Sequence, residues 1–293
     1  GYFDYAATTP VAPEAAEAMV HALTRAFGNP SAQYPLGREA RDAVAAQRAV
    51  IAQALGCDAG ALYFTSCGTE SDNWAIRAAL HIGRHTGRHI ITTAVEHSAV
   101  LEPCKALTQE GYEITYLQPD HAGRITADQV EAALREDTAL VSIMAVNNET
   151  GNVYPIAEIA RRLKARKSRA LLHTDAVQAF LKVPLHAQED GADLISLSAH
   201  KIGGPKGVGA LYIAPALQSK MIPLLRGGGQ EQGLRSGTEA TAQIAGFAKA
   251  VAQRADQLEE ILAHTRAMRD YALERLLSIP TVQVLGTPDA PHI

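Results

Sequence analysis

The stretch Ser196-Leu-Ser-Ala-His-Lys-Ile-Gly-Gly-Pro-Lys-Gly-Val-Gly209 joins the end of an apolar run to a glycine-rich turn. Two hydroxyls, a histidine and a lysine stand where the run ends. Ligands of α/β proteins bind beyond the carboxyl ends of strands, so this pattern predicts a strand that leads into a binding site. The glycines permit close approach of the backbone to a ligand, and the residue order excludes a P-loop.

Similar apolar or β-branched runs alternate with helix-period segments from about residue 61 onward, which predicts an α/β fold. We expect a mostly parallel, seven-stranded sheet flanked by helices. Several runs are apolar throughout, as is typical of strands covered on both faces. The predicted strands are Ala61–Thr65, His89–Thr93, Glu113–Leu117, Ala139–Val146, Ala170–Thr174, Asp193–Ser198 and Gly209–Ile213.

Proline and glycine mark the ends of several predicted helices. One begins at Pro13 and stops at Gly28, and Gly56 ends the helix Arg38–Leu55. Another covers Ile156–Lys167. Residues 239 to about 278 are helix-forming and free of proline, which predicts a long helix that leaves the main domain, and Thr281–Leu285 then resembles the first strand of another domain.

Composition places the chain among ordinary globular proteins. Its 293 residues are 47% hydrophobic and 20% charged, which disfavours disorder and a coiled-coil rod. The 27 basic and 31 acidic residues form no strong basic run, so we expect no nucleic-acid partner and no membrane partner. No apolar stretch is long enough for a membrane helix, and Gly1-Tyr-Phe-Asp4 lacks the features of a signal peptide, which predicts a cytoplasmic protein.

The three cysteines are Cys57, Cys67 and Cys104. Their odd number and wide spacing fit neither a disulfide framework nor a paired-cysteine zinc site. We therefore expect reduced thiols and no metal.

A second strand end, Leu171-Leu-His-Thr-Asp-Ala-Val-Gln178, carries Asp175. An unpaired carboxylate after an apolar strand is costly to bury, so Asp175 should face a cation, for which a protonated pyridine nitrogen is suitable. The alternative is a cap for a following helix. Lys201 is either a solvated charge or a ligand-binding amine. Together, Lys201 and Asp175 provide the two groups that pyridoxal phosphate requires: an amine for the covalent link and an acid for the ring nitrogen.

A third strand end reads Thr65-Ser-Cys-Gly-Thr-Glu-Ser-Asp-Asn73 and runs into a helix. Gly68 and Thr69 at the helix N-terminus offer amides, a hydroxyl and the positive end of the helix dipole, which together suit a phosphate. Ser198 and His200 could donate to the same phosphate. The alternative is an ordinary capping box.

With these pieces the chain resembles the cysteine desulfurases, a branch of the class-V aminotransferases that depend on pyridoxal phosphate. The matching motifs run along the whole chain in the order of the family, and some of their sequences are similar to those of the nitrogen-fixation type. They are Tyr2-Phe-Asp-Tyr-Ala-Ala-Thr-Thr-Pro10, Phe27-Gly-Asn-Pro-Ser31, Phe64–Asn73, Val95-Glu-His-Ser-Ala-Val100, Val146-Asn-Asn-Glu-Thr-Gly151, His173–Gln178, Ser198-Ala-His-Lys201, Arg226-Gly-Gly-Gly-Gln-Glu231 and Leu234-Arg-Ser-Gly-Thr-Glu239.

The resemblance implies the aspartate-aminotransferase-like fold of type I, with part of a smaller α+β domain. It implies a small-domain segment over residues 1–12, a large cofactor domain over 13–250, and a long-helix linker with the start of the small domain over 251–293. The family's nucleophilic cysteine and an arginine for the substrate carboxylate lie downstream of the long helix. We therefore expect the given chain to lack about one small domain and to bind cofactor without persulfide transfer.

The resemblance also implies a role for each site residue. Lys201 and His97 are the catalytic pair, with Lys201 linked to the cofactor and His97 stacked on its ring; a helix cap is the alternative for His97. Asp175 pairs with the ring nitrogen. The other implied cofactor contacts are Gly68, Thr69, Asn148, Gln178, Ser198, His200 and, from a neighbouring subunit, Thr238.

The implied reaction takes L-cysteine to L-alanine and an enzyme persulfide for iron–sulfur cluster assembly. A homodimer and a sulfur-acceptor protein, such as an iron–sulfur scaffold, are the implied partners. A selenocysteine lyase or another class-V enzyme is the alternative within the fold. An inactive, cofactor-binding assembly module is the alternative of another class.

Overall fold

The computed structural model describes residues 1–284 and contains a seven-stranded sheet in the order β1-β7-β6-β5-β4-β2-β3. All seven predicted strands are present, and six agree with the prediction to within one residue at each end. The strands are β1 (Leu62–Thr65), β2 (His89–Thr93), β3 (Glu113–Leu117), β4 (Thr138–Ser142), β5 (Leu171–Asp175), β6 (Leu194–Ser198) and β7 (Gly209–Ile213).

Strand β4 is shorter than predicted, because it ends at Ser142 rather than at Val146. The backbone amide of Met144 donates to the carboxylate of Glu96, with N–O distances of 3.0 and 3.1 Å. A side chain therefore satisfies the amide that would continue the ladder with β2, and pairing with β2 stops there, although Ala145 still donates to the Asp175 carbonyl of β5 at 2.8 Å.

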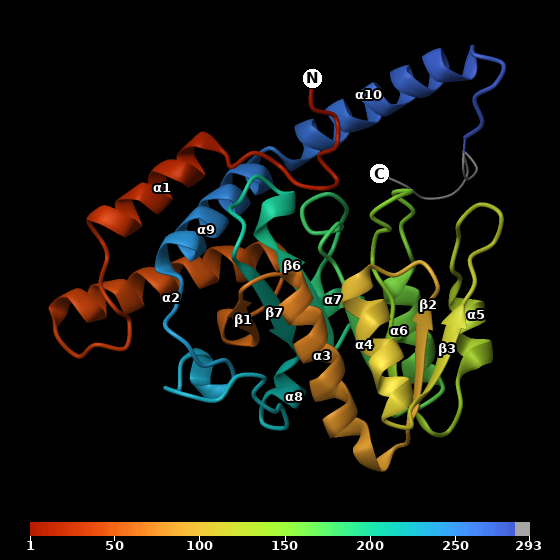
Figure 1. Cartoon of the computed structure of the whole chain (residues 1–293), viewed down its shortest axis with the longest axis horizontal. Helices are drawn as coiled ribbons and strands as arrows, with labels where there is room; N and C mark the ends of the chain where they lie inside the picture. Colours follow the sequence, from red (N-terminus) through yellow and green to blue (C-terminus); the bar gives the residue numbers. More distant parts are fainter. Residues whose placement is uncertain (285–293) are drawn as a thin grey trace.

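The directions of the strands bring the carboxyl ends of most of them to the same edge of the sheet. Strands β2 to β6 pair in parallel, whereas β7 runs antiparallel to both β1 and β6. Strand β1 is thus parallel to β6, and the carboxyl ends of β1, β2, β4, β5 and β6 meet at one edge of the sheet. Figure 1 shows this edge at the top, where the arrows of β2 and β3 point.

Side chains of the strands alternate between two cores on opposite faces of the sheet. Ile90 and Leu140 pack with residues of α3 and α4, whereas Ile91 and Val141 pack with residues of α2, α6 and α9. Figure 1 shows α3 and α4 crossing one face. The result is a three-layer α/β/α domain in which every strand except the edge strand β3 is buried along its length or nearly so.

The helices lie between and around these strands. The α-helices are α1 (Pro13–Thr24), α2 (Pro35–Leu55), α3 (Gly68–Ile82), α4 (Ser98–Gln109), α5 (Ala127–Ala133), α6 (Ile156–Ala165), α7 (Ala187–Asp190), α8 (Pro215–Gln218), α9 (Thr241–Asp256) and α10 (Leu258–Leu277). The short 3₁₀ turns are η1 (Ala59–Ala61), η2 (Gly83–His85), η3 (Ala199–Lys201) and η4 (Glu231–Gly233).

Two predicted glycine stops behave differently. Gly56 ends α2 in the left-handed conformation at φ 72°, as a C-terminal glycine does. Helix α1 ends at Thr24, before Gly28. Gly28 is instead a packing residue, because a Cβ there would lie 2.2 Å from the carbonyl oxygen of Leu36.

The long helix predicted after residue 239 is divided. Helix α9 buries Ile244, Phe247 and Val251 against the domain, and α10 buries none of its residues, so the chain breaks at Gln257 where the buried face has ended. The strand predicted over Thr281–Leu285 is wrong for residues 281–284, which pair with no described strand, and Leu285 lies outside the described residues. A strand forms only with a pairing partner.

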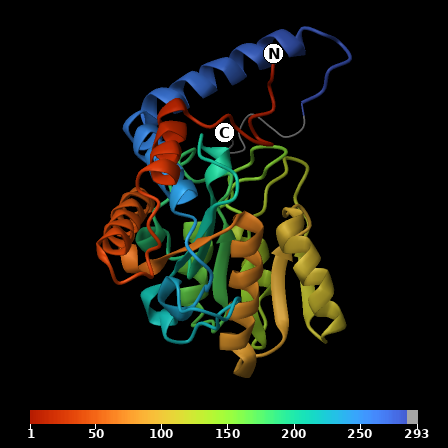
Figure 2. The same cartoon turned by 60° about the vertical axis from the view of Figure 1, so that its left-hand side comes forward.

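In both views α10 and the N-terminal segment lie at the end of the molecule where the parallel strands end (Figures 1 and 2). None of the helices within residues 1–284 is long and apolar enough to cross a membrane.

Candidate functional site

The predicted site residues converge on one cavity of about 460 Å³ at the carboxyl ends of the parallel strands. Nine of the ten predicted cofactor contacts line it, and they follow β1, β2, β4, β5 and β6. The nine are Gly68, Thr69, His97, Asn148, Asp175, Gln178, Ser198, His200 and Lys201. Parallel strands thus unite residues that are far apart in the sequence.

Lys201 ends the η3 turn that follows β6. Its Nζ donates to the carbonyl oxygens of Ala6 and Ala7, at 2.5 and 2.9 Å. Burial lowers its pKa, and the negative charge of Asp175 opposes that change. The N-terminal segment therefore holds a primary amine that is easier to deprotonate than an exposed lysine, as a nucleophilic amine requires.

Asp175 is buried at the end of β5. Its Oδ1 accepts from the Val177 amide at 2.9 Å, and turns follow, so the alternative of a helix cap is wrong. Burial, followed by the charge of Asp72, raises the pKa of Asp175 to about 7. A cation placed beside it would favour the ionised form, because the described residues provide Asp175 with no ion pair.

A layer of buried polar groups lies behind Asp175. His173 contacts the Ser142 and Ser196 hydroxyls at 2.8 and 3.0 Å, and its Nε2 lies 3.5 Å from Asp72 Oδ1. Burial lowers the pKa of His173 to about 4 and raises that of Asp72 to about 7, so the imidazole is neutral at pH 7. Asp72 Oδ1 has no hydrogen-bond partner among the described residues.

The wall at the start of α3 suits an anionic group. Gly68 opens the fifteen-residue helix α3, and a Cβ there would lie 2.7 Å from Val177 Cγ2. The Thr69 and Ser198 hydroxyls lie on this wall beside the positive end of the helix dipole. Burial and the charge of Lys201 lower the pKa of His200 to about 4, so this ring is neutral at pH 7.

Three further residues present polar atoms to the cavity. His97 caps α4, because its Nδ1 accepts from the Ala99 amide at 3.1 Å; the capping alternative is confirmed, and the ring also lines the cavity. Gln178 Oε1 accepts from Lys182 Nζ at 2.6 Å. Its Nε2 donates to the Ala6 carbonyl at 2.9 Å, so the amide has one fixed orientation. Asn148 is half-buried and donates to Glu149.

Thr238 does not line this cavity. It is exposed on the loop between η4 and α9. Glu231 anchors this loop, since its carboxylate accepts from both Arg48 terminal nitrogens at 2.7 Å and from the Phe64 amide at 2.8 Å. The predicted contact of Thr238 with a neighbouring subunit stays a prediction.

The cysteines differ in their surroundings. Burial raises the pKa of the Cys57 and Cys104 thiols to about 12, so both have little thiolate character at neutral pH. Cys67 is half-buried at the N-cap of α3 and lines the cavity. No group of three or more potential metal ligands occurs within residues 1–284.

Sequence reasoning missed several lining groups. The carbonyls of Ala6 and Ala7 are backbone groups, which every residue has, so the sequence gives no sign that these two bind Lys201. Asp72 stands one helical turn after Gly68, on the side of α3 that faces the sheet, and this i, i+4 spacing was an available signal.

The sequence and the structure are both similar to those of known proteins. The family model described as aminotransferase class-V matches residues 1–293. Cysteine desulfurase IscS of Methanosarcina thermophila is 44% identical over 287 residues, which are 98% of this chain and 70% of that relative. A cysteine desulfurase of Trichormus azollae is 46% identical over 286 residues, 97% of this chain and 70% of that relative.

Solved structures are similar over the same length. A structure titled NifS-like protein superposes with a TM-score of 0.94 at 37% identity and covers 99% of this chain and 79% of its own. A structure titled SspA in complex with cysteine superposes with a TM-score of 0.81 at 42% identity, over 86% of this chain and 72% of its own.

Proposed function

The chain belongs to the class-V aminotransferases and, within them, to the cysteine desulfurases, and from this premise we propose that the cavity around Lys201 is where it acts on L-cysteine to give L-alanine. Enzymes of this family depend on pyridoxal phosphate. The observation that carries the proposal is the meeting of nine predicted residues, from five strand ends, in one cavity.

The residues fit the cofactor on chemical grounds. Asp175 is a buried acid that the described residues leave without an ion pair, and a protonated ring nitrogen supplies the missing cation. Gly68 leaves room beside Val177 that a larger residue would fill, at the start of a helix suited to a phosphate. Lys201 supplies the amine for the covalent link.

Each residue then has a task. When bound, pyridoxal phosphate supplies an electron-withdrawing ring that makes the Cα proton of an amino acid acidic. Lys201 takes and returns that proton, with help from His97. Asp175 would pair with the ring nitrogen and keep it protonated, and Gln178 would form a hydrogen bond to the ring oxygen.

Thr69, Ser198 and His200 hold the phosphate, and Gly68 provides the space for it. Asn148 lies near the substrate. We propose that two copies form a dimer in which the exposed Thr238 reaches the phosphate of the second copy. A cysteine thiolate, which the family resemblance places downstream of the long helix, would attack the substrate sulfur; the S–S bond of an enzyme persulfide would form as the Cβ–S bond breaks, leaving alanine. The outer sulfur would then pass to a thiolate of an acceptor protein such as an iron–sulfur scaffold. The high pKa values of Cys57 and Cys104 argue against either thiol as the sulfur nucleophile.

Reduction with borohydride tests the proposal. The chain incubated with pyridoxal phosphate should be yellow, and peptide mapping after reduction should find the cofactor on Lys201. Lys201→Ala should lose both the adduct and the exchange of the L-cysteine Cα proton with deuterium from solvent, whereas Lys220→Ala, at an exposed lysine after α8, should keep both. A colourless wild type with excess cofactor, or an adduct on another lysine, would contradict the assignment.

A further inference from the structure

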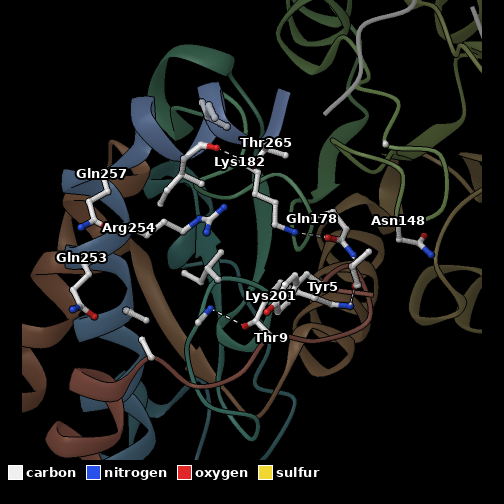
Figure 3. A pocket seen from close by; sticks show the side chains of 18 of the residues that line it. Tyr5, Thr9, Asn148, Gln178, Lys182, Lys201, Gln253, Arg254, Gln257 and Thr265 are labelled. Carbon is white, nitrogen blue, oxygen red and sulfur yellow. Dashed lines mark hydrogen bonds between the residues drawn. The ribbon is translucent and has the colours of Figure 1, made fainter. Parts of the chain in front are cut away.

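A second and larger cavity, of about 810 Å³, adjoins the proposed cofactor cavity (Figure 3). The two share Ala6, Asn148, Glu149, Gln178 and Lys201 on their common wall. Helices α9 and α10 and the N-terminal segment form the other walls. Lys201 therefore lies on the wall that the two cavities have in common.

Two cations project into this larger cavity from different elements. Lys182, in the turns after β5, donates to Gln178 Oε1 at 2.6 Å. Arg254, on α9, donates through Nε to the carbonyl oxygen of Leu181 at 2.8 Å. Figure 3 shows the Arg254 guanidinium extending from α9 toward Lys182. Their anchors lie three residues apart along one turn, so the two side chains approach a common space.

Neither cation has a counter-ion in the part of the chain that the structure describes. No ion pair between residues 1–284 includes Lys182 or Arg254. Burial, followed by repulsion from Arg254 and Lys201, lowers the pKa of Lys182 to about 7. Burial also lowers the pKa of Arg254. Like charges that are buried together without a partner are unfavourable, and such pairs are typical of binding sites for the opposite charge.

The acids on the same walls are engaged elsewhere. Glu149 accepts from Asn148 Nδ2 at 2.7 Å, and its charge acts on Lys201. Glu14, on α1, accepts from Gln253 and is exposed beside Lys249. The groups that face Lys182 are thus the cations Arg254 and Lys201 and the neutral amide of Gln178. Glu149 and Glu14 interact with other residues instead.

The space between Lys182 and Arg254 suits a monoanion. Arg254 is charged at any ordinary pH, whereas Lys182 is near its titration point, so together they supply one to two positive charges. A guanidinium matches the two oxygens of a carboxylate, and Glu149 nearby disfavours a dianion. Apolar side chains of Ile261 and Leu262 line the adjoining wall, as the carbon atoms of an organic acid require.

A chain of hydrogen bonds joins this place to the reacting amine. Lys182 donates to Gln178, Gln178 donates to the carbonyl of Ala6, and Lys201 donates to that same carbonyl. Only the Gln178 side chain and the Ala6 carbonyl thus connect Lys182, where the carboxylate of an amino acid would bind, to Lys201.

We propose that Lys182 and Arg254 form an encounter site for the carboxylate of the amino-acid substrate, which they hold in the larger cavity before its amino group reaches Lys201. The choice of ligand rests on the proposed function. The site precedes, and is separate from, the carboxylate contact that the family resemblance assigns to an arginine downstream of the long helix.

Binding of unreactive fragments tests the proposal on the cofactor-loaded chain. The probe 3-mercaptopropionate carries the carboxylate and thiol of cysteine without the amine, and cysteamine carries the amine and thiol without the carboxylate. Calorimetry should show that Lys182→Met and Arg254→Met each weaken 3-mercaptopropionate about tenfold, because each removes a charge-assisted hydrogen bond. The matched control Lys220→Met should leave its affinity unchanged, and cysteamine should be indifferent to all three variants.

NMR of lysine-labelled chain gives a second readout. Saturation with 3-mercaptopropionate should raise the pKa of Lys182, since a bound carboxylate favours the ammonium form. The signal of the exposed Lys220 should not change when the probe is added. Equal affinity of 3-mercaptopropionate for wild type and both variants would overturn the proposal. Tighter binding of inorganic phosphate through the same two residues would overturn the assignment to a carboxylate.

The two proposals fail separately. Neither measurement requires turnover, and both can be repeated on the chain without cofactor. A chain that forms no adduct on Lys201 but binds 3-mercaptopropionate through Lys182 and Arg254 would refute the proposed function alone. A chain that forms the adduct but binds the probe independently of both residues would refute the encounter site alone.

Discussion

The two cavities share Gln178 and Lys201 and differ in the sign of the buried charged groups that each has alone. Asp72 and Asp175 line the smaller one, and their carboxyl pKa values are raised. Lys182 and Arg254 line the larger one, and their pKa values are lowered. In both cavities burial is the leading cause.

This difference indicates what each cavity receives. A buried acid with a raised pKa becomes a stable anion only when a cation joins it, and a buried base needs an anion in the same way. The smaller cavity therefore suits a ligand with a cationic ring and the larger cavity a ligand with an acidic end. Gln178 separates them and contacts both sides, through Lys182 and through the Ala6 carbonyl that Lys201 also uses.

The largest effect is expected from Asp175→Asn. Without a carboxylate the ring nitrogen loses its ionic partner, so the affinity for pyridoxal phosphate and the rate of exchange of the L-cysteine Cα proton should each fall by roughly a hundredfold. Asp193→Asn is the control, because Asp193 is a largely buried acid that accepts from the Leu172 amide and does not line the cavity. Cofactor titration by absorbance and NMR of deuterium exchange at Cα measure the two quantities. Undiminished exchange by Asp175→Asn would show that the buried acid does not select a cationic ring.

A smaller effect, on stability, is expected from Lys182→Met in the chain without ligands. The pKa of Lys182 is about 7, against an ordinary value of 10.5, so the cost of burying the ammonium is complete below pH 7 and fades as the pH rises toward 10.5. Methionine removes this cost. Urea unfolding should show a gain on the order of a few kcal/mol at pH 7 and a smaller gain at pH 9.

The exposed Lys220→Met should change stability little at either pH. A gain from Lys182→Met that is equal at pH 7 and pH 9 would mean that Lys182 carries no buried charge. The expected pattern also explains why a cation that destabilises the free chain is useful: it is stabilised once a carboxylate binds.

Sequence patterns predicted the residues of the smaller cavity better than the two cations of the larger cavity. Asp175 and Lys201 follow buried strands, and because parallel strands end at one edge, their meeting in space follows from the fold class alone. Lys182 and Arg254 come from a turn and a helix, and nothing in their local sequence says that they face one space. The break between α9 and α10 was missed for a related reason, since no glycine or proline marks it.

The smallest effect, with the opposite pH dependence, is expected from Asp72→Asn in the same ligand-free chain. The pKa of Asp72 is about 7, against an ordinary value of 3.8, so the cost of its buried charge is absent below pH 3.8 and complete above pH 7. The gain in unfolding free energy should therefore grow between pH 4 and pH 7 and stay level above. We expect about 1 kcal/mol at pH 7, because the asparagine amide must find a partner where Asp72 Oδ1 has none.

Lys182→Met and Asp72→Asn test the difference between the two cavities, because their gains in unfolding free energy should change with pH in opposite directions. Asp42→Asn, an exposed acid on α2, is the control for Asp72→Asn and should show no such trend. Removal of the Asp72 charge should also lower the pKa of Asp175, which carboxyl NMR measures directly, because that charge is the second cause that raises it. If the gain from Asp72→Asn shrank as the pH rose, both cavities would respond to pH alike, and the difference in buried charge could not be what selects their ligands.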